Sequence, residues 1–486
     1  MLDMLDRRDR RDAPEAEHLD VLIVGAGISG IDAAYHLQTR LPGKSFAVLE
    51  ARDAIGGTWD LFRYPGVRSD SDMYTLGFPF RPWRGDKAIA AGPDIRDYVE
   101  ETARAFGIDR RIRFGHRATR ASWSSPDARW TVEVETGQGV RRLRCGFLFL
   151  CSGYYDYDAG YRPEWPGEAE YGGRFVHPQH WPRDLDHSGK KVVVIGSGAT
   201  AMTLVPAMAA AGAAHVTMVQ RSPSYVVSRP SRDRLARPLG ARLTRMKNVA
   251  LGAWFFNLAR RRPAKVREKL IDMLRAELPQ GFDVDRHFRP SYDPWDQRLC
   301  LVPDGDLFAA IRAGTVSVAT GEIETFTGTG IRLRGGEEIE ADIVVTATGL
   351  VVKLLGGIAL DIDGAPAGAA GRLVYNGMML EDVPNLAFSF GYTNASWTLK
   401  CDLISRYLCR LLRHMAARGH RVCVPRVRGD VERRPLVDFS SGYVSRAESV
   451  LPKQGTRKPW RVPQNYFRDV ATLGFGRVTD EEMEFR

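Results

Sequence analysis

The sequence predicts an α/β fold with two Rossmann-like dinucleotide-binding domains, the second inserted in a discontinuous first domain, plus a helical insertion. Two glycine-rich loops stand about 170 residues apart; each follows a β-branched run and opens a helical stretch. Two further apolar runs, residues 145–153 and 341–349, end in similar small-residue turns. We interpret these endings as the two crossings between the domains.

The first loop, GAGISG, follows the strand-like residues 19–24. Its tight strand-to-helix turn needs a positive φ at the first glycine, and a diphosphate must approach bare backbone at the second. The next strand-like run ends at Glu50, whose carboxylate can accept hydrogen bonds from ribose hydroxyls and would repel a 2′-phosphate. The loop therefore suits FAD or NAD, and the expected contacts are Gly25, Gly27, Ser29, Gly30 and Glu50.

The second loop, GSGATA, follows residues 191–195. Here the next strand-like run ends in Gln220, Arg221 and Ser222, without an acidic residue. A planar guanidinium can clamp a 2′-phosphate, so this loop predicts NADPH. The expected contacts are Gly196, Gly198, Ala199, Thr200, Arg221 and Ser222.

The 486 residues are enough for two or three domains. The C-terminal third is expected to complete the first domain. We divide the chain into a disordered tail (1–17), an N-terminal portion of the FAD-binding domain (18–152), an NADP-binding domain (153–340) with a helical insertion at about 228–290, and a C-terminal portion of the FAD-binding domain with a C-terminal segment (341–486).

The sequence shows neither the pattern of a signal peptide nor that of a membrane-spanning segment. The first 17 residues lack the apolar core of a signal peptide, and the longest nearly apolar stretch, residues 249–259, has 11 residues, too few to span a bilayer. The six cysteines form no CxxC pair and stand mostly within apolar runs, as buried thiols do. These features predict a cytoplasmic, reducing location.

The string Tyr171-x-Gly173-x-x-x-His177-x-x-x-Trp181-Pro182 resembles the fingerprint of Baeyer-Villiger monooxygenases, which usually begins with Phe. Trp181 favours this branch of the class B flavoprotein monooxygenases over the related amine- and sulfide-oxidising enzymes. The resemblance covers nearly the whole chain and is closest to the branch of the ethionamide-activating monooxygenase. Further matching segments are residues 56–59 (GGTW), 63–66 (RYPG), 295–300 (WDQRLC), 391–397 (GYTNASW) and 451–455 (LPKQG).

The resemblance implies that NADPH reduces FAD, that the reduced flavin adds O2 at C4a, and that this peroxyflavin converts a ketone to an ester or lactone. Sulfides or thioamides would take the same oxygen atom. By family match Arg298 is the catalytic cation and Asp70 its orienting partner, with Thr58, Trp59 and Asp70 beside the cofactor. An arginine suits this role because it stays charged and does not deliver a proton.

Some features depart from the family or leave alternatives open. Many relatives carry Lys where this chain has Gln297, so recognition of NADPH would depend on Arg221 and Ser222. His177 and His180 lack a third ligand at a plausible spacing, and we expect no metal. Three alternatives remain: a flavin-containing N- or S-monooxygenase without Baeyer-Villiger activity, a non-oxygenating FAD/NADPH reductase, and a non-catalytic dinucleotide sensor. A disulfide reductase would need a redox cysteine pair, which the sequence lacks.

The positive charge of the chain is concentrated in one segment. Residues 231–275 hold 13 Lys or Arg and 3 Asp or Glu, and this balance of +10 equals the formal charge of the whole chain. Basic residues flank Trp254, Phe255 and Phe256. The favoured interpretation is a solvated helical insertion over the active site, with these aromatics as its core. The alternative is weak contact with an anionic membrane surface. No nucleic-acid-binding motif accompanies the charge.

Overall fold

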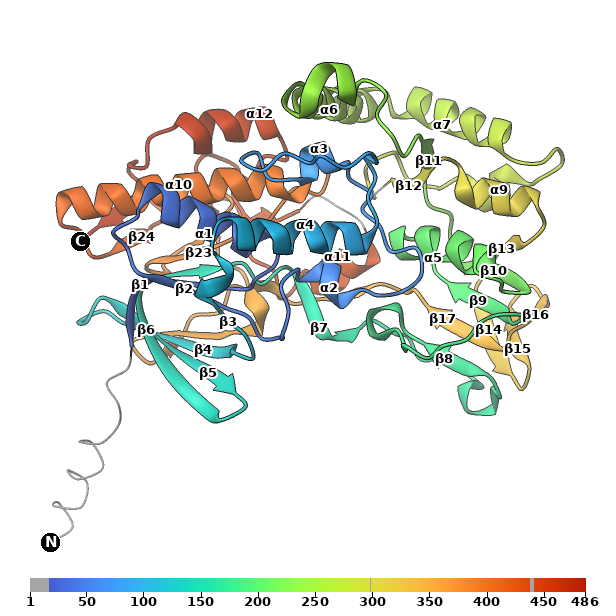
Figure 1. Cartoon of the computed structure of the whole chain (residues 1–486), viewed down its shortest axis with the longest axis horizontal. Coiled ribbons are helices and arrows are strands. Elements are labelled where there is room, and N and C mark those ends of the chain that lie inside the picture. Colours follow the sequence, from blue (N-terminus) through green and yellow to red (C-terminus); the bar gives the residue numbers. More distant parts are fainter. Residues whose placement is uncertain (1–16, 298, 438–440) are drawn as a thin grey trace, which may run out of the picture.

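The computed structural model describes residues 17–297, 299–437 and 441–486 (Figure 1). The predicted disordered tail, residues 1–17, lies outside the described residues except for Glu17. The Glu17 carboxylate accepts two hydrogen bonds of 2.6 Å from the guanidinium of Arg113. No described helix is both long and apolar enough to cross a bilayer.

The first sheet follows the order β20-β19-β4-β5-β6-β1-β2-β3, and β23 also pairs with β6. Its strands are β1 (His18–Val24), β2 (Phe46–Leu49), β3 (Ile112–Arg113), β4 (Arg117–Ser124), β5 (Arg129–Thr136), β6 (Gly139–Leu150), β19 (Ala359–Ile362), β20 (Ala365–Pro366) and β23 (Leu386–Phe388). In the parallel part, Val24 of β1 stands opposite Leu49 and Leu150. The carboxyl ends of three strands therefore meet at one edge, where ligands bind in such sheets.

Burial on both faces explains the continuous apolar runs of these strands. Val21 and Ile23 pack under three helices, and Leu22 and Val24 pack toward Trp130 on the opposite face. The three helices are α1 (Ile28–Arg40), α4 (Gly92–Ala105) and α10 (Trp397–Arg418). In Figure 1 these helices lie above the first sheet, and strands β4 and β5 lie below them at the bottom of the view.

The second sheet is parallel, with the order β13-β10-β9-β17-β8. Its strands are β8 (Arg174–Val176), β9 (Lys191–Ile195), β10 (His215–Gln220), β13 (Val316–Thr320) and β17 (Ile343–Thr346). Helices α5 (Ala199–Ala210) and α9 (Asp306–Arg312) cover one face. The antiparallel strands β14 (Ile323–Thr327), β15 (Gly330–Leu333) and β16 (Glu338–Glu340) cover the other. With these two sheets, the predicted fold class is confirmed.

One predicted boundary is wrong. The sequence predicts that residues from 341 onward belong to the FAD-binding domain, but Ile343 of β17 pairs with both Val192 and Arg174 in the second sheet. The chain leaves this sheet only after Thr346, through β18 (Leu350–Val352), which pairs antiparallel with β7 (Tyr155–Gly160). The two crossings therefore lie side by side. A strand buried on both faces looks alike in either sheet, and only its pairing shows where it belongs.

The helical insertion predicted at about 228–290 contains α6 (Ala236–Arg261), α7 (Pro263–Glu277) and α8 (Val284–Phe288). It is flanked by the parallel pair β11 (Val226–Arg229) and β12 (Cys300–Pro303). Gly240, with φ 71° and ψ 162°, interrupts α6 after its first turn. Helices α6 and α7 lie along one edge of the molecule, away from the first sheet (Figure 1, top).

Short elements complete the chain. They are α2 (Thr58–Leu61), α3 (Met73–Leu76), α11 (Gly442–Ala447), α12 (Tyr466–Asp469), β21 (Val374–Tyr375), β22 (Met379–Leu380), β24 (Cys423–Pro425), β25 (Arg434–Pro435), β26 (Lys453–Gln454), β27 (Met483–Phe485) and the single turns η1 (Asp109–Arg111), η2 (Glu168–Glu170), η3 (Pro178–His180), η4 (Leu354–Gly357) and η5 (Val470–Phe475). All six cysteine side chains are buried, as predicted.

Candidate active site

The first glycine-rich loop connects β1 to α1 at the carboxyl edge of the first sheet. Gly25 has φ +106°, and a Cβ there would stand 2.5 Å from the carbonyl oxygen of Cys151. A Cβ at Gly30 would stand 1.8 Å from the carbonyl oxygen of Gly25. A Cβ at Gly27 would meet only the backbone of Gly57, at 3.5 Å. The loop therefore fits a dinucleotide diphosphate, with exposed backbone at the N-terminus of a 13-residue helix.

The side chain of Glu50, directly after β2, is hydrogen-bonded to the backbone of this loop. Its Oε2 accepts a 2.8 Å hydrogen bond from the Ala26 amide, and its Oε1 accepts a 3.0 Å bond from the Arg52 amide. Burial raises the pKa of the Glu50 carboxyl, against the opposing effect of the two amides. The predicted contact of Glu50 with a ribose stays a prediction.

The second loop repeats the first at the edge of the second sheet. Gly196 has φ +134°, and a Cβ there would stand 2.3 Å from the carbonyl oxygen of Ala347. Gly198 is exposed, and a Cβ there would meet no described atom within 4 Å. Ala199 and Thr200 begin helix α5 directly after it. This loop also leaves its helix N-terminus open to a diphosphate.

Arg221 and Ser222 are the residues that the sequence predicts to bind the 2′-phosphate of NADPH. Both follow β10 directly and are exposed. Ser197 of the second loop donates its hydroxyl to the carbonyl of Ser222, at 3.1 Å. This contact joins the end of β10 to the phosphate loop.

A cavity of about 300 Å³ lies between the two loops. It brings together seven of the predicted site residues: Gly27, Ser29, Thr58, Trp59, Asp70, Ala199 and Thr200. Gly25, Gly30 and Gly196 shape the turns instead. Arg298, the predicted catalytic cation, lies outside the described residues.

Asp70 follows a loop that packs against the second sheet's helices. In this loop Arg68 forms a bidentate pair with Asp306 of α9, with N–O distances of 2.5 and 3.3 Å. Asp70 lines the 300 Å³ cavity and also a second cavity of about 540 Å³ that reaches α6. Its predicted pairing with Arg298 stays a prediction.

Sequence reasoning missed an aromatic wall of this cavity. Tyr154, Tyr155 and Tyr157 follow the small-residue turn after β6 and line the cavity. Tyr155 donates its hydroxyl to Thr58 Oγ1 at 2.7 Å, and the Tyr154 ring stacks on Trp397 with centroids 5.2 Å apart. The run YYDY directly after the turn was the available signal.

Trp59, expected beside the cofactor by family match, and Trp397, in the matching segment 391–397, lie at the same cavity. Both line the cavity and are half-buried. Trp397 Nε1 donates a 2.9 Å hydrogen bond to Ser29 Oγ in the first loop. Trp397 therefore contacts the predicted FAD loop across 368 residues of chain.

A buried ion pair supports the opposite wall. Tyr392, which lines the cavity, donates its hydroxyl to Asp469 Oδ2 at 2.6 Å, and Lys400 Nζ donates to the same oxygen at 2.8 Å. The side chains of Lys400 and Asp469 are 2% and 4% exposed. Removing one partner of a buried pair leaves an uncompensated charge and costs about 3–5 kcal/mol. The pair thus fixes the segment 391–397 against α10 and α12.

The fingerprint segment, residues 171–182, contributes strand β8 to the second sheet. Tyr171 is buried and donates its hydroxyl to the carbonyl of Ala341 at 3.0 Å. Its ring contacts Phe175 and Phe326. His180 Nε2 donates to the carbonyl of Asp158 at 3.1 Å, next to the crossing strand β7.

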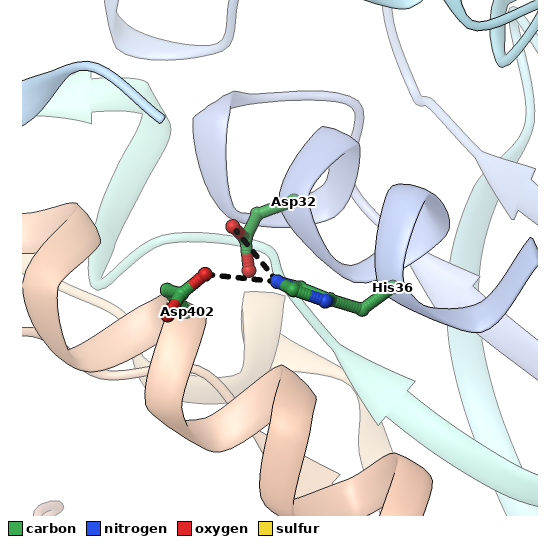
Figure 2. A group of neighbouring side chains, drawn as sticks. All are labelled: Asp32, His36 and Asp402. Atoms are coloured by element: carbon green, nitrogen blue, oxygen red, sulfur yellow. Dashed lines mark hydrogen bonds and ion pairs between the residues drawn. The ribbon is translucent and has the colours of Figure 1, made fainter. Parts of the chain in front are cut away.

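A cluster of buried titratable groups lies behind the first loop. Figure 2 shows Asp32 and His36 of α1 pointing toward Asp402 of α10. His36 Nε2 stands 2.9 Å from Asp402 Oδ1 and 3.9 Å from Asp32 Oδ1. Among the described residues, this is the group of three whose ligand atoms lie close enough together to hold a metal ion.

The hydrogen bonds of His36 do not fit a metal site. Arg40 Nε donates to His36 Nδ1 at 3.0 Å, so the ring carries its proton on Nε2 and donates it to Asp402. A metal would need the lone pair of Nε2, and the proton would then face the guanidinium. The cluster is therefore a hydrogen-bonded contact between α1 and α10.

Asp32 is expected to make the stability of the protein pH-dependent. Burial raises the pKa of Asp32 from 3.8 to about 7; the charge of Asp402 adds to this and that of Arg245 opposes it. Between pH 3.8 and about pH 7, the Asp32 carboxyl is protonated in the folded state and ionised in the unfolded state. The free energy of unfolding therefore falls as pH rises. Asp32→Asn should therefore raise the apparent Tm by about 2 °C or more at pH 8, and by less at pH 5.

Asp402 provides a control, because its effect on stability is expected to depend on pH in the opposite direction. Burial would raise its pKa, but the hydrogen bond from His36 and the charges of Arg406 and Arg245 outweigh this and lower it. Its stabilising effect is present above its unfolded pKa and is lost as pH falls through its folded pKa. Asp402→Asn should therefore lower Tm at pH 8. Thermal melts at both pH values check both variants, and an Asp32→Asn gain independent of pH would contradict the assignment.

Comparison with known proteins identifies the family. Residues 23–84 match the NAD(P)-binding Rossmann-like domain, and residues 88–354 match the flavin-binding monooxygenase-like family. The chain is 54% identical over 478 residues to the FAD-containing monooxygenase EthA of Mycobacterium tuberculosis, covering 96% of this chain and 98% of that protein. It is 51% identical over 478 residues to EthA of Mycolicibacterium smegmatis, covering 96% and 97%.

Two solved structures share the fold. A steroid monooxygenase bound to NADP matches with a TM-score of 0.74 and 21% identity, over 96% of this chain and 99% of that one. A cyclohexanone monooxygenase from a Rhodococcus species, bound to NADP+, matches with a TM-score of 0.75 and 18% identity, over 97% and 100%.

The predicted identification as a flavin monooxygenase is confirmed by these matches. The family model spans more than half of the chain, and the relatives are similar along nearly their whole length. FAD and NADP, the cofactors predicted from the two loops, are named for these relatives and structures. The chain belongs to the flavin-binding monooxygenase-like family.

Proposed function

We propose that this flavin-binding monooxygenase uses FAD, NADPH and O2 to insert one oxygen atom into ketones, giving esters or lactones, and that it also S-oxygenates sulfides or thioamides. The observation that carries the proposal is the 300 Å³ cavity, which joins both phosphate loops, Trp59, Trp397 and Asp70. A reduced nicotinamide and a flavin must meet in such a space. Cyclohexanone and steroid monooxygenases, named for two solved structures, support a ketone substrate.

FAD belongs at the first loop, where Gly25, Gly27 and Gly30 accommodate the diphosphate and Ser29 contacts Trp397. The bound flavin supplies the oxygen-activating chemistry. The tyrosines and tryptophans of the cavity exclude water, which would otherwise promote loss of hydrogen peroxide. Arg298 supplies a fixed positive charge without an acidic proton, and Asp70 orients it.

The second cavity is the proposed substrate chamber. Its volume of about 540 Å³ is in the range for small-molecule sites, and it shares Asp70, Ser71, Thr393 and Ala395 with the first cavity. Its lining includes the charged residues Arg229, Arg232, Asp233, Arg234 and Lys247, and also a set of aromatic and aliphatic residues: Phe256, Trp295, Leu299, Leu301 and Tyr466. An apolar ketone or sulfide would be desolvated there and reach the flavin from the side of Asp70.

A panel of ketones and sulfides, assayed with NADPH under isotopically labelled O2, tests the proposal. Mass spectrometry should find one labelled oxygen atom in an ester or lactone, and one in each sulfoxide. Sulfoxide without any ester would favour an N- or S-monooxygenase lacking Baeyer-Villiger activity. NADPH oxidation without any labelled product would favour a non-oxygenating reductase.

Arg221→Ala should change the choice of nicotinamide cofactor. We expect the KM for NADPH to rise by roughly 10-fold or more, and that for NADH to change little, because only NADPH carries the dianion that a guanidinium can clamp. Steady-state kinetics with both cofactors measure the effect. Arg142, which is 69% exposed and stands near the start of β6, far from the carboxyl end of that strand at Leu150, provides the control Arg142→Ala. Equal effects of Arg221→Ala on both cofactors would refute the assignment.

A further inference from the structure

Helix α6 presents an apolar stripe to solvent. Leu243, Met246 and Trp254, in the helical stretch after Gly240, are 54%, 67% and 63% exposed, and Ala250 between them is exposed too. Their spacing of three and four residues places them along one side of the helix. Single exposed apolar residues are ordinary, but a stripe along the part of α6 that follows Gly240 marks an interaction surface.

The opposite side of α6 is fixed to the protein. Arg245 donates hydrogen bonds to the carbonyls of Tyr74, Thr75 and Gly77, at 2.9, 3.1 and 2.7 Å, and Asn248 donates to Asp72 at 3.0 Å. The helix therefore cannot roll to bury the stripe without breaking these bonds. The exposure is built into the fold.

Positive charge surrounds the stripe. Arg242 is exposed in the N-terminal half of α6, and Arg261, Arg262 and Lys265 are exposed where α6 passes into α7. The three acidic residues of the segment 231–275 are each paired: Asp233 with Lys247 at 2.5 Å, Glu268 with Arg289 at 2.9 Å, and Asp272 with Arg275 at 3.3 Å. The surface that remains around the apolar stripe is cationic.

We infer that the outer face of α6 binds an anionic lipid surface, with the apolar stripe inserted at the headgroup level and the flanking cations against the lipid phosphates. An amphipathic helix of this kind lies in the plane of the interface. A second copy of the chain fits this face poorly, because two cationic surfaces would be brought together and repel each other. The inference is independent of the substrate proposed above.

The inner side of the same helix lines the 540 Å³ cavity, through Lys247, Gly252 and Phe256. Binding at the outer face would hold this cavity beside the lipid surface. Its contents would then exchange with apolar molecules dissolved in the bilayer.

Vesicle flotation of the full-length protein tests the inference. We expect it to float with phosphatidylcholine vesicles that contain phosphatidylglycerol, to bind vesicles of phosphatidylcholine alone far less, and to lose anionic binding as salt rises. Absence of binding to the anionic vesicles, or equal binding to both kinds, would overturn the inference.

Two variants locate the surface. The triple variant Arg242→Gln, Arg261→Gln and Arg262→Gln should weaken binding by roughly 100-fold, at about fivefold for each cation near the lipid. The double variant Met246→Ser and Trp254→Ser should weaken it by roughly 10-fold or more. Far-UV circular dichroism and melting temperature establish that each variant is folded.

Matched controls remove the same chemistry elsewhere. Arg110, Arg418 and Arg477 are exposed cations outside the segment, so their triple replacement by Gln should leave binding unchanged. Val140 and Phe475 are 64% and 79% exposed, and their replacement by Ser should also have no effect. If the controls weaken binding as much as the α6 variants do, the charge acts without a defined surface and the inference fails. If instead the α6 variants split a stable wild-type dimer, a second copy covers the stripe and the inference fails as well.

Discussion

Replacing Gly25 by valine is expected to abolish flavin binding. The variant would place a β-branched residue at φ +106° and a Cβ 2.5 Å from the carbonyl oxygen of Cys151. Positive φ costs about 1–2 kcal/mol and forced overpacking about 1–3 kcal/mol, so FAD affinity should fall by roughly 100-fold or more. The flavin absorbance per chain of the purified protein, after titration with FAD, measures the loss.

Gly139 provides the matched control. It also has φ +106°, but a Cβ there would meet no described atom within 4 Å, and it begins β6 at the end far from the loop. Gly139→Val therefore introduces the same backbone strain without the contact. If Gly139→Val also loses its flavin, general destabilisation explains both results; if Gly25→Val keeps its flavin, the first loop is not the FAD site.

Replacing Arg298 by alanine is expected to separate NADPH consumption from oxygen transfer. Flavin binding should persist, and the oxygenated product should fall by roughly 100-fold or more, as when other preorganised charge-stabilising groups are removed. Arg298→Lys should restore little, because an ammonium lacks the planar fork and can give up its proton. The measurement is the ratio of ester or sulfoxide formed to NADPH consumed.

Two further variants define the role of this arginine. Asp70→Ala should reduce the same ratio by a smaller factor, because Asp70 orients the cation and does not touch the oxygen. Arg286→Ala, which removes an exposed arginine of helix α8 in the preceding helical insertion, should leave the ratio unchanged. A wild-type ratio and rate in Arg298→Ala would exclude the proposed oxygenation site.

The phosphate loops could be predicted because their requirements are local. Gly25 and Gly196 lie within a strand, a turn and a helix that are continuous in the chain, and the positive φ of that turn depends on the turn itself. The residues that end the next strands, Glu50 and Arg221, also lie at a fixed distance along the chain. Strand burial, the helical insertion and the buried thiols follow similarly from short-range composition.

The aromatic wall could not be predicted in this way. Tyr155 and Thr58 are 97 residues apart, and Trp397 and Ser29 are 368 apart, so no periodicity relates them. The domain boundary at β17 fails for the same reason, since an apolar strand carries no information about its neighbours. Each of these contacts depends on which strands pair and which helices pack together.

By itself, therefore, the sequence determined the two glycine-rich βα loops and their order, because backbone geometry within a single βα unit requires their glycines. Only the tertiary structure decided that the loops face one cavity, that Tyr392 is held by the buried pair of Lys400 and Asp469, and that the apolar stripe of α6 faces solvent. The physical reason is burial: whether an apolar or charged side chain is covered depends on residues far away in the chain.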